Sequence, residues 1–367
     1  MENKPVRVLQ VLGSLSHGGA ETMVMNYFRK INTSEIQFDF LVHKRVVEGY
    51  EAEILARGGR IFYIDTLRQS GLFRYIYNIV GILKNKGPFV AVHAHTDYQS
   101  GVVALAAKIA GIQKRICHSH STNPPTRLTK VLMPTFSLVA NTFGNHKIAC
   151  GVEAGNFMFR GKSFAVLNNA VDINRYSHKN FEQSNRIRKA LNIPSDGFVL
   201  GHIGRFVPLK NHRFLIEFIN YLHLKGRKVY LILVGDGPLK SDIEKQVELM
   251  GLGSYIKFLG VRDDIPEIFS TMDVFLLPSF SEGIPMVVIE GQAAGKPSIV
   301  SNSVPTEVDL GLGLVSFASV SEGFQVWSDL LDSSIINNDS AQIERIFMEK
   351  GYNIDLNIKK MEEIYLT

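Results

Sequence analysis

The chain has 367 residues, of which 45% are hydrophobic and 20% charged, so it is long enough to form two hydrophobic cores. No segment approaches about eighteen uninterrupted apolar residues, and the apolar run near the N-terminus is short and broken by Gly and Ser, so we expect neither a membrane-spanning helix nor a cleavable signal peptide. Two cysteines, Cys117 and Cys150, are too few and too far apart for a disulfide or zinc framework. We therefore expect buried free thiols in a cytoplasmic protein.

The net charge of +5 hides an asymmetry between the two halves of the chain. Residues 1–178 contain 21 Lys and Arg against 11 Asp and Glu, whereas residues 179–367 contain 19 against 24. Halves of opposite charge indicate two domains with different partners. The basic half would suit nucleic acid, an anionic membrane surface or a phosphorylated acceptor, although a solvated surface would have the same composition.

Strands and helices alternate along the first half of the chain. Apolar runs rich in Val, Ile and Leu predict buried parallel strands at residues 6–15, 38–44, 60–65, 89–95, 114–120 and 146–151. Helical spacing separates them at residues 19–31, 50–59 and 73–87. This alternation is typical of a doubly wound parallel sheet.

The same alternation begins again after residue 190. Strands are predicted at residues 198–204, 229–237, 255–261, 274–279 and 297–301, with helices at residues 214–226, 239–251 and 265–272. Residues 175–197 are polar and contain no strand pattern, which suggests a passage between two domains. The sequence therefore predicts an α/β protein with two Rossmann-like domains in tandem.

Three strand-to-helix turns carry residues suited to binding. In "GSLSHGGAET", Gly13, Gly18 and Gly19 would let a ligand approach the backbone, and the following helix N-terminus would face an anion. A tight turn without a ligand explains this segment equally well. In "GHIGRFVPLKN", Arg205 and Lys210 lie beside Gly204 at a strand's carboxyl end, where two cations would suit a diphosphate; two exposed surface cations are the alternative.

The third turn, "SEGIPMVVIEGQAAGKPSIVS", contains two carboxylates. Pro285 fits the first position of a helix and Gly295 its end, so Glu282 precedes the helix and Glu290 lies inside it. The rise of a helix predicts about 10 Å between the two carboxylates. That separation is too long for a glycosidase pair but suits two anchors for one elongated ligand. A buried glutamate satisfied by protein groups is the alternative for Glu290.

These segments resemble the signature of retaining family-4 glycosyltransferases of the GT-B fold. The resemblance extends from residue 13 to about residue 302 and follows the family's order: "GGAE", "LNNAVDINRY", "GRFVPLKN", "LVGDGP", and E-x7-E at Glu282 and Glu290. The segments "HAHTDYQSG" and "RICHSHST" are similar to members that build bacterial exopolysaccharides and capsules. The resemblance implies two Rossmann-like domains facing across a cleft. It implies an acceptor-side domain at residues 1–180, a nucleotide-sugar domain at 181–345, and a helix at 346–367 returning to the first.

The resemblance also implies roles for the donor side. Arg205 and Lys210 would hold the donor's diphosphate, and with the Gly18–Gly19 amides they would replace a metal ion. Glu290 would accept hydrogen bonds from ribose hydroxyls, and Glu282 would contact the transferred sugar. The implied donor-binding set is Gly18, Gly19, Gly204, Arg205, Lys210, Val261, Glu282, Gly283, Ile284, Pro285 and Glu290, with the backbone near Val261 against the base.

Other roles fall on the first domain. His118 and His120 end a strand, and one of them, with His120 favoured, resembles a family histidine that touches the donor sugar. A loop or core position remains the alternative for both. With His118, His95 and Asp97 would border the acceptor side, and the departing phosphate itself would take the acceptor's proton. The implied catalytic set is Glu282, His120, Arg205 and Lys210, with no metal and no cofactor.

The segments depart from the family at three places. Ala170 stands where the family has Gly, Gly151 stands where it often has Ser, and the segment after Asn302 lacks the usual tail motif. These departures put the boundary of the donor pocket in doubt rather than the class of protein.

The leading hypothesis is a metal-independent, retaining hexosyltransferase. It would move a sugar from a nucleotide diphosphate donor, UDP-linked, to a glycan acceptor on a polyprenyl diphosphate at the inner membrane face. Apolar segments at residues 72–86 and 129–139 would support peripheral membrane contact. A nucleotide-sugar epimerase or phosphorylase on the same fold is the alternative. Nucleic-acid binding is disfavoured because basic residues are not clustered with aromatic ones. A dehydrogenase is disfavoured because G-x-G-x-x-G is absent.

Overall fold

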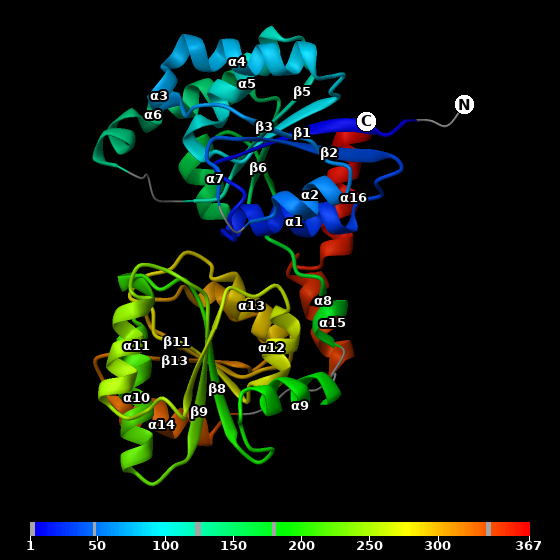
Figure 1. Ribbon diagram of the computed structural model, residues 1–367. Coiled ribbons are helices and arrows are strands. Elements are labelled where there is room, and N and C mark those ends of the chain that lie inside the picture. The colour runs from blue at the N-terminus through cyan, green and yellow to red at the C-terminus, as the bar shows by residue number, and fades with distance from the viewer. Residues whose placement is uncertain (1–3, 47–48, 122–125, 178–180, 335–338) are drawn as a thin grey trace. The chain divides into compact units, whose positions relative to one another are not determined.

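The computed structural model describes residues 4–46, 49–121, 126–177, 181–334 and 339–367. The chain forms two compact units, one of Met1–Ala170 with Gly351–Thr367 and the other of Val171–Lys350. Each unit is built on one parallel sheet between layers of helices (Figure 1). Within the described ranges, no helix is long and apolar enough to cross a bilayer. The two Rossmann-like domains expected from the sequence are confirmed.

The first unit contains a seven-stranded parallel sheet of order β3-β2-β1-β4-β5-β6-β7. Its strands are β1 (Val6–Leu12), β2 (Ile36–Val42), β3 (Ile61–Tyr63), β4 (Ala91–Ala94), β5 (Lys114–Ser119), β6 (His146–Ala149) and β7 (Ala165–Val166). Its helices are α1 (Gly19–Lys30), α2 (Glu51–Ala56), α3 (Leu67–Ser70), α4 (Leu72–Asn85), the 3-10 turn η1 (Asp97–Gln99), α5 (Ser100–Ile109), α6 (Arg127–Phe143), α7 (Val152–Phe159) and α16 (Ile354–Leu366).

Helices cover both faces of this sheet. Phe28 of α1, Ile54 of α2 and Met361 of α16 share one core with the strands. Ile79 of α4 and Val103 of α5 belong to a second core against the strands. Because both faces are covered, strands of this sheet can be buried along their whole length, as β2 is at every residue.

The second unit contains a six-stranded parallel sheet of order β10-β9-β8-β11-β12-β13. Its strands are β8 (Phe198–Ile203), β9 (Val229–Val234), β10 (Ile256–Gly260), β11 (Val274–Leu277), β12 (Ser298–Ser301) and β13 (Val315–Ala318). Its helical elements are α8 (Ile173–Ser177), α9 (Phe181–Ala190), η2 (Pro208–Lys210), α10 (His212–Leu224), α11 (Lys240–Leu249), α12 (Ile265–Thr271), α13 (Met286–Ala293), η3 (Thr306–Val308), α14 (Phe324–Asp332) and α15 (Ser340–Glu349).

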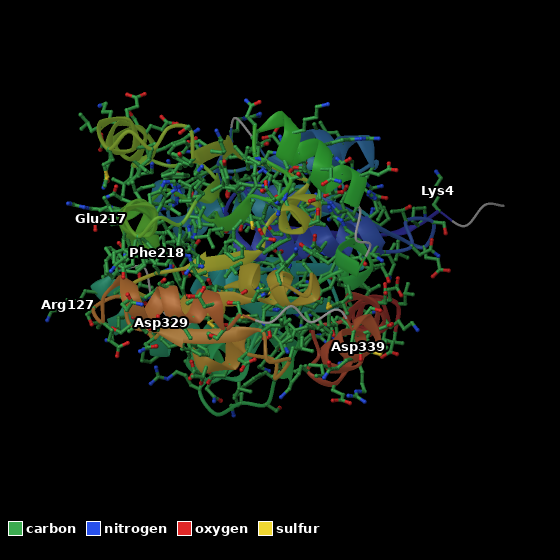
Figure 2. The ribbon with its side chains drawn as sticks, turned by 90° about the horizontal axis from the view of Figure 1, so that it is seen from below. Lys4, Arg127, Glu217, Phe218, Asp329 and Asp339 are labelled. Atoms are coloured by element: carbon green, nitrogen blue, oxygen red, sulfur yellow. The ribbon has the colours of Figure 1, made fainter. Side chains whose placement is uncertain are left out.

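One face of the second sheet packs against α10, α11 and α14. Trp327 of α14 is fully buried with Phe218 of α10, while Glu217, the neighbour of Phe218, pairs with Arg213 (Glu217 and Phe218 are labelled in Figure 2). On α12, Phe269 contacts Phe275 of β11 with ring centroids 5.6 Å apart. The contrast between buried Phe218 and the exposed pair of Glu217 shows that α10 is amphipathic, with its apolar side toward the sheet.

The prediction that residues 175–197 form a passage between domains is wrong. This segment contains α9 and part of α8, and α9 packs on α12 within the second unit. Arg188 donates to the carbonyl oxygen of Thr271 at 2.9 Å and pairs with Asp273 at 3.2 Å. The polar composition misled the prediction because these side chains bind backbone carbonyls and a carboxylate rather than solvent alone. The structure divides the chain after Ala170, whereas the sequence placed the boundary at residue 180.

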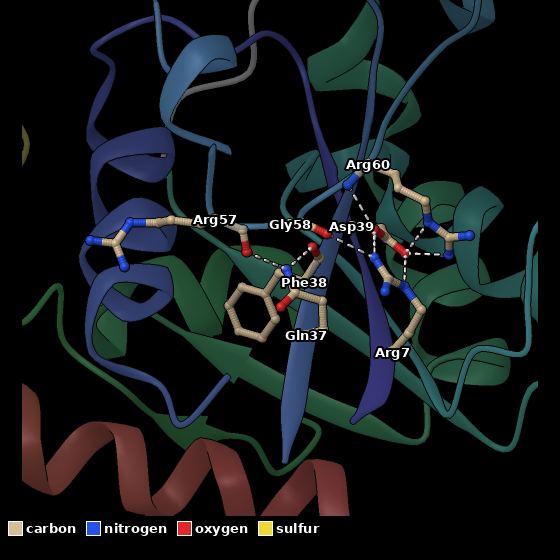
Figure 3. Close-up of polar contacts among 7 residues, drawn as sticks. All are labelled: Arg7, Gln37, Phe38, Asp39, Arg57, Gly58 and Arg60. Atoms are coloured by element: carbon tan, nitrogen blue, oxygen red, sulfur yellow. Dashed lines mark hydrogen bonds and ion pairs between the residues drawn. The ribbon is translucent and has the colours of Figure 1, made fainter. Parts of the chain in front are cut away.

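A buried carboxylate interrupts the apolar strand β2. Asp39 accepts hydrogen bonds from Arg7 Nε at 2.6 Å, from the backbone N–H of Arg60 at 2.8 Å and from Arg60 Nη2 at 2.6 Å (Figure 3). Burial alone would raise the pKa of Asp39, but the bonds from Arg7 and Arg60 outweigh it and lower the pKa. The charge is thus fully satisfied by the protein and ties β1, β2 and the start of β3 together.

Replacing Asp39 by Asn should destabilise the first unit. Both arginines would lose their anionic partner, and because they reach solvent we expect about 2 kcal/mol, below the value for a fully buried pair. The depressed pKa places this stabilisation above about pH 4, so it should disappear as the pH falls further. Urea unfolding followed by circular dichroism at pH 7 and pH 3 measures both. Glu217→Gln, which breaks an exposed pair, should change stability by less than about 0.5 kcal/mol.

Candidate functional site

The strand order of the second unit brings two loops together at one edge of its sheet. β8 lies between β9 and β11, so the connection after β8 runs away from the connection after β11. In an open parallel sheet, ligands bind at such a reversal, beyond the carboxyl ends of the strands. Arg205 and Lys210 follow β8, and Glu282 follows β11. The structure therefore brings these three sequence-predicted residues to one site.

Hydrogen bonds hold the two loops against each other. The backbone N–H of Phe280 donates to the carbonyl oxygen of Leu209 at 2.9 Å. Asn211 donates from Nδ2 to the carbonyl oxygen of Pro278 at 3.2 Å, and its backbone adopts φ +53°. Asn tolerates this left-handed conformation better than most residues, so it suits the tight turn that starts α10. The loops form a preorganised pair rather than two independent segments.

Lys210 and Glu282 form an ion pair across these loops. Lys210 Nζ lies 2.6 Å from Glu282 Oε1, and the two side chains are only 18% and 11% exposed. Arg205, in contrast, is exposed, and no side-chain partner for its guanidinium occurs among residues 4–46, 49–121, 126–177, 181–334 and 339–367. One cation of the predicted pair is thus free for an anion, and the other is held by the glutamate that would face the sugar.

Glycines allow the backbone beneath Arg205 to pack tightly. Gly235, with φ +129°, approaches the carbonyl oxygen of Gly204 so closely that a Cβ would lie 2.2 Å from that oxygen. The backbone N–H of Gly204 donates to Val234 and that of Phe206 donates to Asp236, at 2.9 and 3.0 Å. The segment "LVGDGP" therefore supports the Arg205 loop.

Glu290 lies on α13, behind the Glu282 loop. It is partly exposed, and burial of the carboxyl group raises its pKa to about 7, although nearby Arg175 and a hydrogen bond from Tyr176 act in the opposite direction. The sequence analysis did not identify Tyr176 or Arg175 as site residues, although both lie in the segment "LNNAVDINRY". A carboxylate accepts about four hydrogen bonds, so Tyr176 satisfies part of Glu290 and leaves acceptor capacity.

The remaining donor-side residues occupy the same edge of the second sheet. The helix α13 begins at Met286 with Pro285 as its N-cap, one residue later than predicted, and Gly295 follows its C-cap with φ +66°. Gly283 and Ile284 are exposed in the preceding loop. Val261 follows β10 and is 40% exposed. Their assignment to hydroxyl, phosphate and base contacts stays a prediction.

In the first unit, Gly18 and Gly19 begin α1 after β1. Gly18 is the N-cap, without a side-chain cap, and a Cβ on Gly19 would meet no atom within 4 Å. The carboxylate of Glu21 folds back over this turn: it accepts a hydrogen bond from Ser14 Oγ at 3.4 Å and one from its own backbone N–H. Burial raises the pKa of Glu21. The helix N-terminus thus already faces one carboxylate, which the sequence analysis did not identify.

The predicted histidines lie at the carboxyl ends of β4 and β5. His118 is 1% exposed and His95 is 5% exposed, whereas His120 is half-buried. His95 Nδ1 lies 2.9 Å from His120 Nε2, so these two residues are in direct contact. Asp97, with φ +46°, accepts the backbone N–H of His120 at 2.7 Å, and burial raises its pKa to about 6. Two of the three acceptor-side candidates, His95 and Asp97, therefore contact the ring and the backbone of His120.

A fourth histidine, His93, joins this group. His93, His95 and His118 each offer one ring nitrogen within 4.8 Å of the others, a spacing compatible with a metal ion. The rings, however, already bond to one another: His93 Nε2 lies 3.1 Å from His118 Nδ1, and the His93 and His118 planes are within 9° of parallel. Two ring nitrogens 3.1 Å apart and hydrogen-bonded to each other leave no space for an ion between them. The arrangement fits a hydrogen-bonded group better than a metal centre.

Two expectations concerned the thiols and the apolar helices of the first unit. Cys117 and Cys150 are free, with Cys117 buried and Cys150 half-buried. On α4, Phe73 is 88% and Tyr77 76% exposed, and on α6 Val131 is 69% exposed. The predicted exposed apolar side chains are confirmed in both segments.

The raised pKa of Glu290 predicts a pH dependence of stability. An acid whose folded pKa exceeds its unfolded value contributes stability below about pH 4.5 that is lost as the pH rises through 7. Relative to Glu290→Gln, the native protein should therefore lose roughly 1–2 kcal/mol between pH 5 and pH 8, allowing for partial solvent screening. Urea unfolding of both proteins measures this difference in the free energy of unfolding. The fluorescence of Trp327, the single tryptophan and part of the core of the second unit, follows the unfolding. An equal pH profile in both proteins would contradict the shift, and Glu217→Gln is the exposed control.

Comparison with known sequences identifies relatives along the whole chain. The family described as Glycosyl transferases group 1 matches residues 183–310. EpsF of Bacillus subtilis (strain 168), a protein described as a glycosyltransferase, is 37% identical over 375 residues, covering 100% of this chain and 97% of EpsF. An Escherichia coli α-1,3-galactosyltransferase, named for UDP-Gal and α-D-GlcNAc-diphosphoundecaprenol, is 25% identical and 84% of each chain is covered. CapH of Staphylococcus aureus, a capsular polysaccharide biosynthesis glycosyltransferase, is 24% identical, with 78% of each covered.

Solved structures share the fold. Anabaena HepE, crystallised with UDP, has a TM-score of 0.77 at 19% identity, covering 98% of this chain and 99% of HepE. WaaG, a glycosyltransferase of lipopolysaccharide biosynthesis, has a TM-score of 0.68 at 15% identity, with 98% and 99% covered. The GT-B fold expected from the sequence is confirmed. With EpsF matched from end to end at 37% identity, the chain belongs to the glycosyl transferases group 1 family and is a glycosyltransferase.

Proposed function

We propose that this glycosyltransferase is a retaining, metal-independent family-4 hexosyltransferase of exopolysaccharide or capsule biosynthesis. It moves a sugar from a UDP-sugar to a glycan on a polyprenyl diphosphate. The observation that carries the proposal is the meeting of Arg205, Lys210 and Glu282 at the strand-order reversal of the second sheet. The E-x7-E spacing supports retention, and the capsular and galactosyltransferase relatives support the pathway class.

The two cations act on the donor's diphosphate. Arg205 is exposed and receives the phosphates first; Lys210 then exchanges its glutamate partner for a phosphate oxygen. That exchange frees Glu282 to accept a hydroxyl of the transferred sugar, so donor binding and sugar contact are coupled. As the C1–O bond breaks, its electron pair remains on the diphosphate, where both cations stabilise the growing charge. The acceptor hydroxyl attacks from the same face and transfers its proton to the departing phosphate oxygen.

The other site residues hold the two ends of the donor. Glu290 accepts ribose hydroxyls with the capacity that Tyr176 leaves, while Gly283, Ile284 and Pro285 border the sugar and Val261 the base. Uridine is proposed because HepE was crystallised with UDP and with UDP-glucose and the galactosyltransferase relative is named for UDP-Gal. Gly18, Gly19 and His120 of the first unit keep the roles that the family resemblance implies, phosphate contact for the two glycine amides and sugar contact for His120. The cations and these amides take the place of a metal ion.

A lipid-linked acceptor explains the surface of the first unit. On α4, Leu72, Phe73 and Tyr77 are 49%, 88% and 76% exposed. On α6, Leu128 and Val131 are 67% and 69% exposed. Both helices contain Arg and Lys but no Asp or Glu, a composition that suits apolar side chains binding at an anionic bilayer surface. The E. coli relative, named for a diphosphoundecaprenol acceptor, supports the same assignment.

Arg205→Ala and Glu290→Ala should both impair transfer. Loss of Arg205 removes a charge that stabilises the leaving diphosphate and should lower kcat/KM about 10²–10³-fold. Loss of Glu290 removes a charged hydrogen bond and should lower it about tenfold or more, chiefly through KM. The measurement is sugar transfer, or slow donor hydrolysis, across a panel of nucleotide sugars. Arg213→Ala removes an exposed arginine of α10 and should leave the rate unchanged.

Three outcomes separate the alternatives. Full activity in both variants would exclude this site. Conversion of a donor to a second nucleotide sugar without acceptor would identify an epimerase. An activity that requires added Mg²⁺ or Mn²⁺ and is abolished by EDTA would contradict metal independence.

Phe73→Ser combined with Val131→Ser should weaken membrane binding. Co-sedimentation with phosphatidylglycerol vesicles should fall about tenfold or more, because each buried apolar side chain contributes roughly 1.5–3 kcal/mol. Leu249→Ser, which removes an apolar side chain 89% exposed on α11, is the matched control and should have no effect. Absence of native binding at both low and high salt would refute the membrane assignment.

A further inference from the structure

The four histidines of the first unit form an ordered array. Two hydrogen-bonded pairs, His93 with His118 and His95 with His120, join β4 to β5 and the residues that follow these strands. The pairs stack on each other, since the rings of His93 and His95 have centroids 4.0 Å apart and those of His118 and His120 4.2 Å apart. Burial lowers the pKa of every ring, that of His120 to about 3, so all four are neutral near pH 7. A neutral imidazole has one N–H and one bare nitrogen.

Gln10 sets the proton positions in the pair of His95 and His120. Gln10 donates from Nε2 to Tyr365 Oη at 3.1 Å, and its Oε1 lies 2.9 Å from His95 Nε2. An amide oxygen only accepts, so His95 Nε2 carries the proton and His95 Nδ1 is bare. His120 Nε2 must then donate to His95 Nδ1 at 2.9 Å. The other nitrogen of His120, Nδ1, is therefore a bare acceptor.

Tyr365, at the end of α16, sets the other pair. Its hydroxyl oxygen already accepts from Gln10, and in the part of the chain that the structure describes the only further partner of the hydroxyl group is His93 Nδ1 at 2.7 Å. A buried hydroxyl hydrogen without a partner is costly, so Tyr365 donates to His93 Nδ1. His93 Nε2 then donates to His118 Nδ1 at 3.1 Å. His118 consequently carries its proton on Nε2.

Two ring nitrogens of the array are left for contact with a ligand. His118 Nε2 and His120 Nδ1 are buried and have no hydrogen-bond partner among the described residues. Each lies on its ring away from the histidine with which that ring pairs. One is an N–H donor and the other a bare acceptor, on stacked rings. A hydroxyl group both accepts and donates hydrogen bonds and so matches this pair. A phosphate near pH 7 has few O–H donors for the bare nitrogen.

We infer that Gln10 and Tyr365 are positioning residues that hold all four imidazoles in the Nε2–H form, so that His118 and His120 present a donor and an acceptor to the hydroxyls of a neutral sugar. This inference extends the proposed function by assigning both histidines to sugar rather than phosphate. It also gives α16 a role in the site, since this helix supplies Tyr365, 355 positions beyond Gln10. The tautomers themselves do not depend on which donor the enzyme uses.

Nuclear magnetic resonance of the full chain labelled with ¹⁵N-histidine tests the tautomers directly. At pH 7.5, two-bond ¹H–¹⁵N correlations should give all four rings a protonated Nε2 and a bare Nδ1. In Tyr365→Phe, His93 and His118 should shift toward a mixture of tautomers, while His95 and His120 keep theirs. Tyr75→Phe is the matched control: it removes another fully buried phenol, bonded to His43 Nε2 at 2.8 Å, and should change His43 alone.

The native spectrum decides the inference even if the variant does not fold. A protonated Nδ1 on His118 or His120 would overturn it, and so would stoichiometric Zn²⁺ or Co²⁺ binding that replaces the ring protons. Methyl α-D-glucopyranoside should shift the His118 and His120 signals, and inorganic phosphate at the same concentration should not. Absence of a sugar shift, or a larger phosphate shift, would refute hydroxyl recognition. A correct array with no transferase activity would instead refute the proposed function.

Discussion

The reversal of strand order in each parallel sheet is the constraint on which the site depends. In the first unit it lies between β1 and β4, and in the second between β8 and β11. At each reversal, consecutive crossovers go to opposite faces, so the loops beyond the strands diverge and leave backbone N–H groups and side chains facing open space. Gly18 and His95 occupy this edge in the first unit, and Arg205 and Glu282 occupy it in the second. The strand order therefore determines which loops can form a site, whatever side chains those loops carry.

Two partly or fully buried carboxylates show how a structural acid differs from one available to a ligand. Asp39 receives five hydrogen bonds from Arg7 and Arg60, and its pKa is lowered. Glu290 has a hydrogen bond from Tyr176 and the nearby charge of Arg175, but burial outweighs both and raises its pKa to about 7. Protein groups thus satisfy the carboxylate of Asp39, whereas among the residues that the structure describes only part of the acceptor capacity of Glu290 is used. An incomplete acid at a sheet's carboxyl edge is stabilised when ligand hydroxyls supply the missing donors.

The elements that the sequence predicted are those in which local pattern and burial agree. Continuous apolar runs such as residues 229–234 predict buried parallel strands, and glycine turns locate the loops after them. The prediction for residues 175–197 failed because a polar helix can be held against its neighbours by side chains that donate to backbone carbonyl oxygens, as Arg188 does. The contacts of Gln10 with Tyr365, 355 positions apart, and of Glu290 with Tyr176 follow only from the tertiary structure. Spacing predicted Glu282 and Lys210 as site residues but could not predict that they form an ion pair.

That pair gives the proposed donor site two states rather than one. Before a donor binds, Glu282 neutralises Lys210, so the site presents the single free charge of Arg205 and avoids two adjacent unpaired cations at low exposure. A diphosphate carries enough charge to compensate Arg205 and Lys210 together, whereas a single weak anion does not. Release of Lys210 and exposure of Glu282 are then consequences of the same ligand. Under the proposed function, this site would discriminate a sugar diphosphate from free phosphate or free sugar, because only the diphosphate sugar supplies both an anion for Lys210 and a hydroxyl for Glu282.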